Sequence, residues 1–331
     1  MTTALDLIKN SELSVNEKVE KILRFSKFNK SLSTQKTHFY SLWDFCKFVA
    51  TINQIELSED RNLEISRIMK TFCDLSAIDA KLLLADYLIS LEERKQSSST
   101  VATKLAAIKD HISFQKGITN IPLWDLDFIK APKVENKKVP GPTEEEFSIL
   151  LKKFKELEKS PSYIDRRNAL LCYILSFCAL RVSEALSIEI NDIDWKKGII
   201  LINRKGKKLK QEFSIGKKIL NKLQKFVLEN KRFDGPLFIN QDKVNKTFTG
   251  LTRGSAHRIV KKIGESVGMN ELHPHKFRHF SATEAIWAAD GNRHEAMKFT
   301  SHLSETQMTR YEDERNNVQL NIATKIEEKW L

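Results

Sequence analysis

The residues of this 331-residue chain that could do chemistry gather near its C-terminal end, where five of the eight histidines lie within thirty residues. These are His273, His275, His279, His294 and His302. The run His273-Pro-His275, with His279 four residues further on, has the spacing of metal ligands, so a metal-dependent nuclease is one hypothesis. No cysteine lies nearby, and the closest carboxylates, such as Glu271 and Glu284, are single ones. A metal centre that acts on phosphodiesters uses clustered acidic ligands, so we expect no bound metal and no cofactor.

The same segment also carries groups suited to phosphate chemistry without a metal. With two residues from upstream in the chain, they form a set of six. In chain order the set is Arg181, Lys205, His275, Arg278, His302 and Tyr311. His275 lies 27 residues before His302, and Tyr311 follows His302 by nine residues. Direct attack on phosphorus builds negative charge on the phosphate oxygens, which fixed cations can stabilise. Arginines suit this task because a planar guanidinium binds two oxygens at once and stays protonated.

In this order and spacing the six residues resemble those of the tyrosine recombinases of the phage-integrase and Xer type. That family carries an arginine in a G-L-R-x-S-E box, a lysine in a β-hairpin, H-x-L-R-H, G-H, and a tyrosine nine residues beyond that last histidine. The resemblance covers roughly residues 143–315 and implies a mixed α/β catalytic domain, preceded by a helical core-binding domain. Three positions depart from the pattern: Ala179 replaces Gly, Phe277 replaces Leu, and Ser301 replaces Gly. All three affect backbone or packing rather than reacting groups, so we expect an active enzyme.

The resemblance implies a role for each group. Arg181 and Arg278 would hold oxygens of the scissile phosphate, and His302 would hydrogen-bond to a non-bridging oxygen. Tyr311 would be the nucleophile, forming a 3′-phosphotyrosyl bond that conserves the phosphodiester energy for religation. A free tyrosine has a pKa of about 10, so only about one in a thousand is ionised at pH 7. His275 is the candidate base, and the two neighbouring arginines would favour the phenolate.

The general acid is expected in the basic turn between two strands. Lys205 would donate a proton to the departing 5′ oxygen. Arg204, Lys207, Lys208 and Lys210 crowd the same turn, and any of its lysines could fit this role. The assignment to Lys205 therefore stays open among them.

Two further residues and the remaining tyrosines have structural interpretations. We expect Glu184 and His279 to support the arginines and the helix packing from behind. The other tyrosines occur in helical apolar patterns and are expected in the core; they are Tyr40, Tyr87, Tyr163 and Tyr173.

The first 130 residues are expected to be helical and to form one domain. Apolar residues at three- and four-residue spacing predict a helix over 31–49, with Phe39, Trp43 and Cys46 on one face. Further amphipathic stretches run over 77–91 and onward from Ser97, whose serines offer N-caps. Residues 131–142 contain three prolines and a glycine among lysines, which predicts an extended basic linker.

Residues 143–331 are expected to form the second domain. Thr143 and Glu146 have capping-box spacing and predict a helix to about residue 157, followed by a helix over 162–177. Residues 198–203 and 211–215 read as two strands of a hairpin, and the remainder from Ile219 as mainly helical. The fold class is thus mainly α with a small antiparallel β-sheet.

Charge favours a nucleic-acid partner for the second domain. The chain has 55 Lys and Arg against 43 Asp and Glu, a net charge of +12. Residues 1–130 carry 18 basic and 17 acidic side chains, and residues 131–331 carry 37 and 26. The excess therefore lies almost wholly in the second part, where it suits a polyanion. Four scattered cysteines indicate reduced thiols, and no apolar run is long enough to span a membrane, so we expect a cytoplasmic, nucleoid-associated protein.

The expected activity is site-specific DNA recombination, by a homotetramer on two double-stranded DNA sites. After Tyr311 an apolar stripe recurs every four residues at Val318, Ile322, Ile326 and Trp330. It predicts a terminal helix that docks either on its own domain or in trans on a neighbouring protomer. The alternatives are a type IB topoisomerase or telomere resolvase, and a DNA-binding protein that has lost catalysis.

Overall fold

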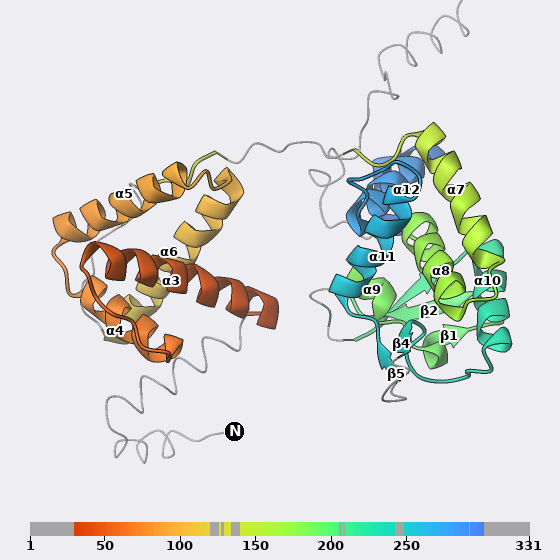
Figure 1. Cartoon of the computed structure of the whole chain (residues 1–331), viewed down its shortest axis with the longest axis horizontal. Helices are drawn as coiled ribbons and strands as arrows, with labels where there is room; N and C mark the ends of the chain where they lie inside the picture. The colour runs from red at the N-terminus through yellow and green to blue at the C-terminus, as the bar shows by residue number, and fades with distance from the viewer. Residues whose placement is uncertain are drawn as a thin grey trace, which may run out of the picture. The chain divides into compact units, whose positions relative to one another are not determined.

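A computed structural model of the chain shows a mainly helical protein with small antiparallel sheets, as the sequence predicted (Figure 1). It describes residues 30–119, 126, 129–133, 140–204, 207, 209–241, 248–290 and 292–300. The chain divides into two compact units, residues 1–135 and 136–331, and this division falls inside the segment expected to be a linker. Among the described helices, none has the length and apolar character needed to cross a bilayer.

The first unit is built from helices that begin at polar N-caps. Ser31 and Ser76 each accept a hydrogen bond from the backbone N–H three residues on, and Asp60 accepts two such bonds. The helices are α3 (Leu32–Ile52), α4 (Arg61–Cys73), α5 (Ala77–Glu93) and α6 (Ser98–Thr119). Helix α4 was not among the helices predicted from the sequence. Its buried residues recur at helical spacing, at Ile65, Ile68, Met69 and Phe72.

The core of this unit contains interlocked aromatic rings. Phe45 packs edge-to-face against both Phe72 and Tyr87, with ring centroids 5.0 and 5.1 Å apart. Phe39 and Trp43 are partly buried against the same cluster, as the helical pattern predicted. The expectation for Tyr40 was wrong: its side chain is 60% exposed, because it follows Phe39 by one residue and so points about 100° away around the helix.

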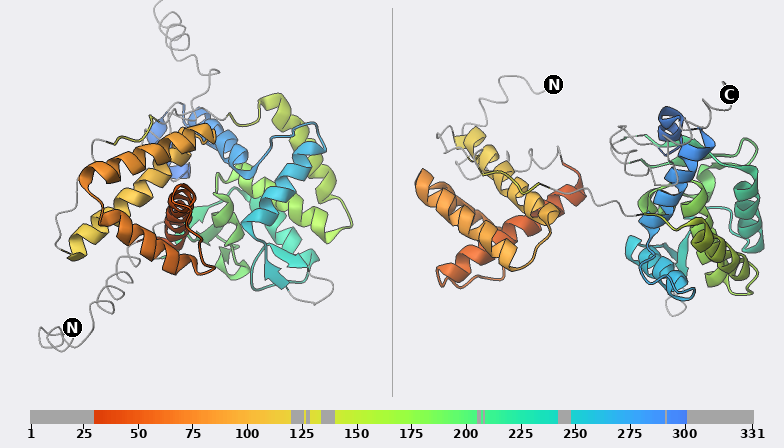
Figure 2. Two further views of the ribbon diagram at one scale, coloured as in Figure 1. Left: turned by 60° about the vertical axis from the view of Figure 1, so that its left-hand side comes forward. Right: turned by 90° about the horizontal axis from the view of Figure 1, so that it is seen from above.

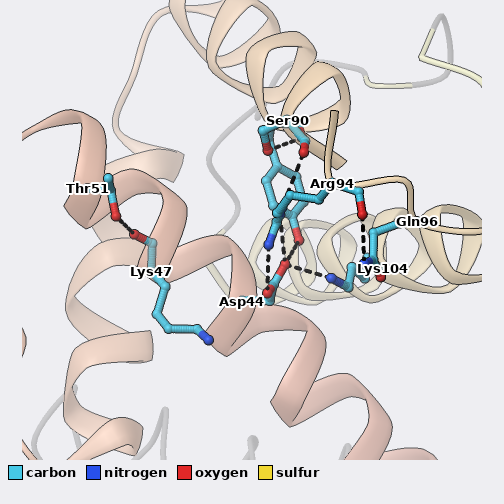
Figure 3. Close-up of polar contacts among 8 residues, drawn as sticks. Asp44, Lys47, Thr51, Ser90, Arg94, Gln96 and Lys104 are labelled. Atoms are coloured by element: carbon cyan, nitrogen blue, oxygen red, sulfur yellow. Dashed lines mark hydrogen bonds and ion pairs between the residues drawn. The ribbon is translucent and has the colours of Figure 1, made fainter. Parts of the chain in front are cut away.

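A partly buried carboxylate joins three helices of the first unit. Asp44 on α3 accepts hydrogen bonds from Tyr87 on α5 (2.8 Å) and from Lys104 on α6 (2.7 Å). Arg94, directly after α5, adds two bonds of 3.2 Å (Figure 3). Burial opposes the ionisation of Asp44, but the hydrogen bonds outweigh it and lower the pKa to about 2. Near neutral pH the Asp44 carboxylate is therefore ionised, and it holds the three helices together.

The second unit is arranged around one buried helix. Residues 169–176 of α8 (Tyr163–Phe177) are buried on every side, which is the pattern of a central helix. It contacts α7 (Glu144–Glu158), α9 (Val182–Leu186), α10 (Lys217–Glu229) and α12 (Pro274–Ala288) (Figure 1). The predicted capping box is present, since Thr143 and Glu146 each accept from the other's backbone N–H. Gly141 just before it lies so close to α12 that a Cβ would come within 2.6 Å of the Phe280 nitrogen.

A three-stranded antiparallel sheet lies beside these helices. Its order is β1 (Ile193–Asp194), β2 (Ile199–Ile202) and β3 (Gln211–Ser214). Ile200 is paired with Phe213, and both are buried, whereas Leu201 on the opposite face is 37% exposed. This register confirms the predicted hairpin and places the basic turn at its tip.

One part of the second unit differs from the sequence analysis. A second hairpin, β4 (Ile239–Gln241) with β5 (Phe248–Gly250), precedes α11 (Arg253–Glu265). Its strands have three residues each, which is too short to show the alternation of apolar and polar residues typical of a strand. The sequence therefore predicted only a mainly helical region here. Figure 1 and the left view of Figure 2 place this hairpin at the lower end of the unit and α13 (Arg293–Thr300) at the upper end.

Removing the Asp44 carboxylate is predicted to destabilise the first unit. Asp44→Ala leaves Lys104, whose side chain is only 14% exposed, without its counter-charge. We expect a loss of about 3 kcal/mol in the free energy of unfolding of this unit, measured by urea denaturation of the full chain. The contribution is fully present above about pH 4 and declines as the pH falls towards 2, because the folded pKa lies below the unfolded one. The exposed Asp86→Ala on α5 is the control, and equal losses in the two variants would contradict the prediction.

Candidate active site

Arg181 is held at the start of α9 by a carboxylate three residues further on. Its Nη1 donates to Glu184 Oε1 at 2.8 Å, and its backbone N–H donates to Glu184 Oε2 at 2.9 Å. Glu184 is 3% exposed, whereas the Arg181 side chain is 36% exposed. The carboxylate thus fixes the base of the arginine and leaves part of the guanidinium at the surface, as the sequence led us to expect for Glu184.

The loop before Arg181 makes a tight turn at Ala179. This residue has φ of +49°, in the left-handed region that glycine enters most easily. The turn explains why a glycine is usual at this position in the family pattern, and the Cβ of alanine adds strain there. The Ala179 carbonyl accepts a hydrogen bond from Arg278 Nη1, 99 residues away in the chain.

Arg278 is the most deeply buried of the predicted site residues that the structure describes. It lies on α12, is 2% exposed, and donates from Nη2 to the Thr300 carbonyl at 2.8 Å. Its guanidinium therefore joins the turn before Arg181 to the end of α13. Thr300 immediately precedes the segment that contains His302, so this one side chain orders both flanks of the site.

His275 stands one turn before Arg278 on the same helix. Its ring meets that of His279 edge-on, with centroids 4.7 Å apart. Desolvation lowers the pKa of His275, and the positive charges of Arg278, His273 and Arg181 lower it further. The structure thus brings Arg181, His275 and Arg278 into one electrostatic cluster, in which the pKa of this imidazole is lowered.

The β2–β3 turn adds a third arginine to this neighbourhood. Arg204 lies 5.8 Å above the Phe213 ring, and its pKa is lowered by burial, with Glu184 and Arg181 as its charged neighbours. Its buried Nε has no hydrogen-bond partner among the described residues. Lys210 is instead held by Asp192, with Nζ 2.6 Å from Oδ2, which raises its pKa.

The remaining predicted residues lie outside the part of the chain that the structure describes. They are Lys205, His302 and Tyr311, together with Lys208 and the apolar stripe of the tail. Within the described residues, no three His, Cys, Asp or Glu side chains are grouped as a metal site requires. The described half of the site is therefore two fixed guanidinium groups and one imidazole with a lowered pKa, which together can bind a phosphate oxyanion and accept a proton.

Sequence comparisons relate this chain to known proteins. Residues 143–317 match the model of the phage integrase family. A tyrosine recombinase of Synechocystis sp. is 24% identical over 300 residues, covering 89% of this chain and 90% of the relative. The tyrosine recombinase XerC of Roseiflexus castenholzii is 27% identical, covering 82% of this chain and 81% of its own.

Solved structures share the fold. The crystal structure of a lambda integrase dimer bound to a core site has a TM-score of 0.61 at 13% identity, covering 92% of this chain and 95% of that one. The XerH site-specific recombinase in its post-cleavage complex with DNA substrate has a TM-score of 0.60 at 23% identity, covering 75% and 70%.

The charge cluster predicts how His275 titrates. In the full chain carrying ¹³C-labelled histidine, NMR should give His275 a pKa below the ordinary value of about 6.5. Arg181→Gln removes a neighbouring positive charge and should raise that pKa, whereas Lys225→Gln on the exposed face of α10 should leave it unchanged. The His275 resonance is identified by its loss in His275→Gln. A wild-type midpoint at or above about 6.5 would show that the cluster does not act on this ring.

Proposed function

This chain belongs to the phage integrase family and is a tyrosine recombinase, and we propose that Arg181, His275 and Arg278 form the pocket in which it cleaves DNA. The observation that carries the proposal is the clustering of these three groups, which come from two segments almost a hundred residues apart. Residues 1–130 act as the core-binding domain and residues 143–331 as the catalytic domain. The substrate is double-stranded DNA with specific recombination sites.

Cleavage begins with the phenol of Tyr311. Its oxygen attacks the phosphorus while His275 takes the phenolic proton, and Arg181 and Arg278 neutralise the charge that builds on the non-bridging oxygens. His302 hydrogen-bonds to one of those oxygens. The bond from phosphorus to the 5′ oxygen breaks, and a 3′-phosphotyrosyl bond forms in its place. Religation reverses these steps with a 5′ hydroxyl of the partner strand, so the cycle needs neither metal nor cofactor.

A lysine of the β2–β3 turn protonates the departing 5′ oxygen. Lys205 is the proposed donor, with Lys207 and Lys208 as the other candidates. Lys210 is less suited, because a proton donor that is held by Asp192 has a raised pKa and releases its proton less readily.

The central test is a covalent protein–DNA adduct. A suicide substrate that carries the cognate site, incubated with the protein in EDTA, should yield an adduct on a denaturing gel. Tyr311→Phe removes only the nucleophilic oxygen and should abolish the adduct completely while leaving DNA binding intact. Tyr40→Phe is the matched control, since Tyr40 is exposed on α3, and it should form adduct at the wild-type level.

The same gel separates the alternatives. Cleavage that requires a divalent metal indicates a metal-dependent nuclease and contradicts the proposal. Binding without an adduct, on a site shown to be correct, indicates a DNA-binding protein that has lost catalysis. An adduct that reseals without exchange between two sites indicates topoisomerase or resolvase activity.

The active assembly is a homotetramer on two DNA sites, in the cytoplasm and on the nucleoid. A cleft of about 510 Å³ in the catalytic domain supports docking of the C-terminal stripe, either from the same chain or, as we propose, in trans from a neighbouring protomer. Its apolar wall includes Phe177, Phe280 and Phe299, and Glu284 and Glu295 also line it. The apolar stripe after Tyr311 matches this cleft in polarity.

Charging the stripe is predicted to block assembly. Ile322→Asp should abolish the four-subunit complex on paired DNA sites, measured by light scattering, because a carboxylate cannot enter an apolar cleft without losing its hydration. Binding to a single site should be unchanged. Thr324→Asp adds the same charge about 200° further round a helix and should assemble normally. Tetramers of normal stability with Ile322→Asp would contradict docking by this stripe.

A further inference from the structure

A second groove in the catalytic domain has no part in the chemistry described above. It has a volume of about 440 Å³ and lies between α7, α8, α11 and the end of β4. Ile164, Leu251 and Ile259 give it apolar walls, and the amides of Asn168 and Asn240 also line it. This size is typical of sites for small molecules, which occupy roughly 300–1,000 Å³.

The groove contains a buried arginine without a counter-charge. Arg167 is 5% exposed, and within the described part of the chain no carboxylate lies within ion-pair distance of it. Its Nη1 donates to the Ile239 carbonyl at 2.8 Å, and its Nε and Nη2 donate to Asn168 Oδ1 at 3.1 and 2.8 Å. A guanidinium has five N–H groups, so two of them are left for another acceptor. A buried charge compensated only by dipoles is costly, and an anion in the groove would offset that cost.

Two more cations line the groove from α11. Arg258 and Lys262 are both exposed, and among the described residues neither forms an ion pair. Lys153 also lines the groove but is paired with Glu156 at 2.8 Å. The carboxylate of Asp165 lines it too and accepts a hydrogen bond from Ser160 Oγ at 2.7 Å. Positive charge is therefore in excess here.

This groove lies on the flank of α11 that faces away from the active site. His257 on α11 is close enough to His273 to lower its pKa, and His273 precedes the catalytic helix α12. The groove-lining Ser255 and Ile259 are each two residues from His257, which is about 200° around a helix. A ligand in the groove would thus be separate from the phosphate held by Arg181.

From these observations we infer that the groove between α7, α8 and α11 binds a small phosphate ester of nucleotide size. The phosphates lie against Arg167, Arg258 and Lys262, and the organic part lies on the aliphatic wall within reach of the two amides. This inference does not depend on the assignment of Tyr311 or on recombination, because no active-site residue takes part.

Isothermal titration of the full chain tests the inference, with ATP and inorganic pyrophosphate as separate probes at low salt. ATP should bind saturably with one site per chain, and pyrophosphate more weakly because it lacks the part that meets the aliphatic wall. Lys262→Ala should weaken ATP binding about tenfold, as loss of one charge-assisted contact does. Lys261→Ala, the adjacent residue paired with Glu265, should stay within about twofold of wild type.

Three results would overturn the inference. One is the absence of saturable binding of either probe. A second is ATP binding that is lost in Arg181→Ala and kept in Lys262→Ala, which would place the anion in the active site. The third is a chain that does not bind ATP but binds non-cognate duplex DNA more weakly as Lys262→Ala. That result would make the groove a DNA contact. Arg167→Lys is a second variant of the same groove. If Arg167→Lys does not fold, Lys262→Ala still tests the inference, because Lys262 is on the surface.

Discussion

The two segments beside the candidate site are held by one buried guanidinium. Arg278 is almost wholly enclosed, and its two terminal nitrogens donate to the carbonyls of Ala179 and Thr300. A buried charge demands partners, and those partners are backbone atoms of the two segments that flank the site. The need to satisfy one side chain therefore sets the position of the turn before Arg181 and of the end of α13. A residue proposed to bind phosphate also organises the site around it.

Near the candidate site, cations outnumber the carboxylates that could neutralise them. Glu184 is the buried exception, and it orients Arg181 through both its side chain and its backbone. Desolvation lowers the pKa of His275, and the neighbouring positive charges lower it further; Arg204 has Glu184 and Arg181 as its charged neighbours. Positive charge without matching acids costs stability in the free protein, and that cost falls when a polyanion binds. The excess of basic residues in 131–331 is thus seen in the structure as positive charge gathered around the candidate site.

The first unit uses similar groups for a different end. Asp44 faces Arg94, Lys104 and Tyr87, all donors within hydrogen-bond distance, and it joins α3, α5 and α6. Here the carboxylate satisfies the cations, so the cluster stabilises packing and leaves no site open to a ligand. In the groove beside α8, Arg167 has only amide and carbonyl acceptors, and the balance is the reverse.

Features that depend on near neighbours in the chain could be predicted from the sequence. The capping box at Thr143 and Glu146, the α8 helix, the β2–β3 hairpin and the motif around Arg181 all follow from spacing over a few residues. Tertiary structure alone decided that Tyr40 is exposed, that β4 and β5 pair, and that Arg278 reaches a carbonyl 99 residues away. Local patterns record backbone preference and which face is apolar. They do not record which distant segment covers that face, because this depends on how all the elements pack together.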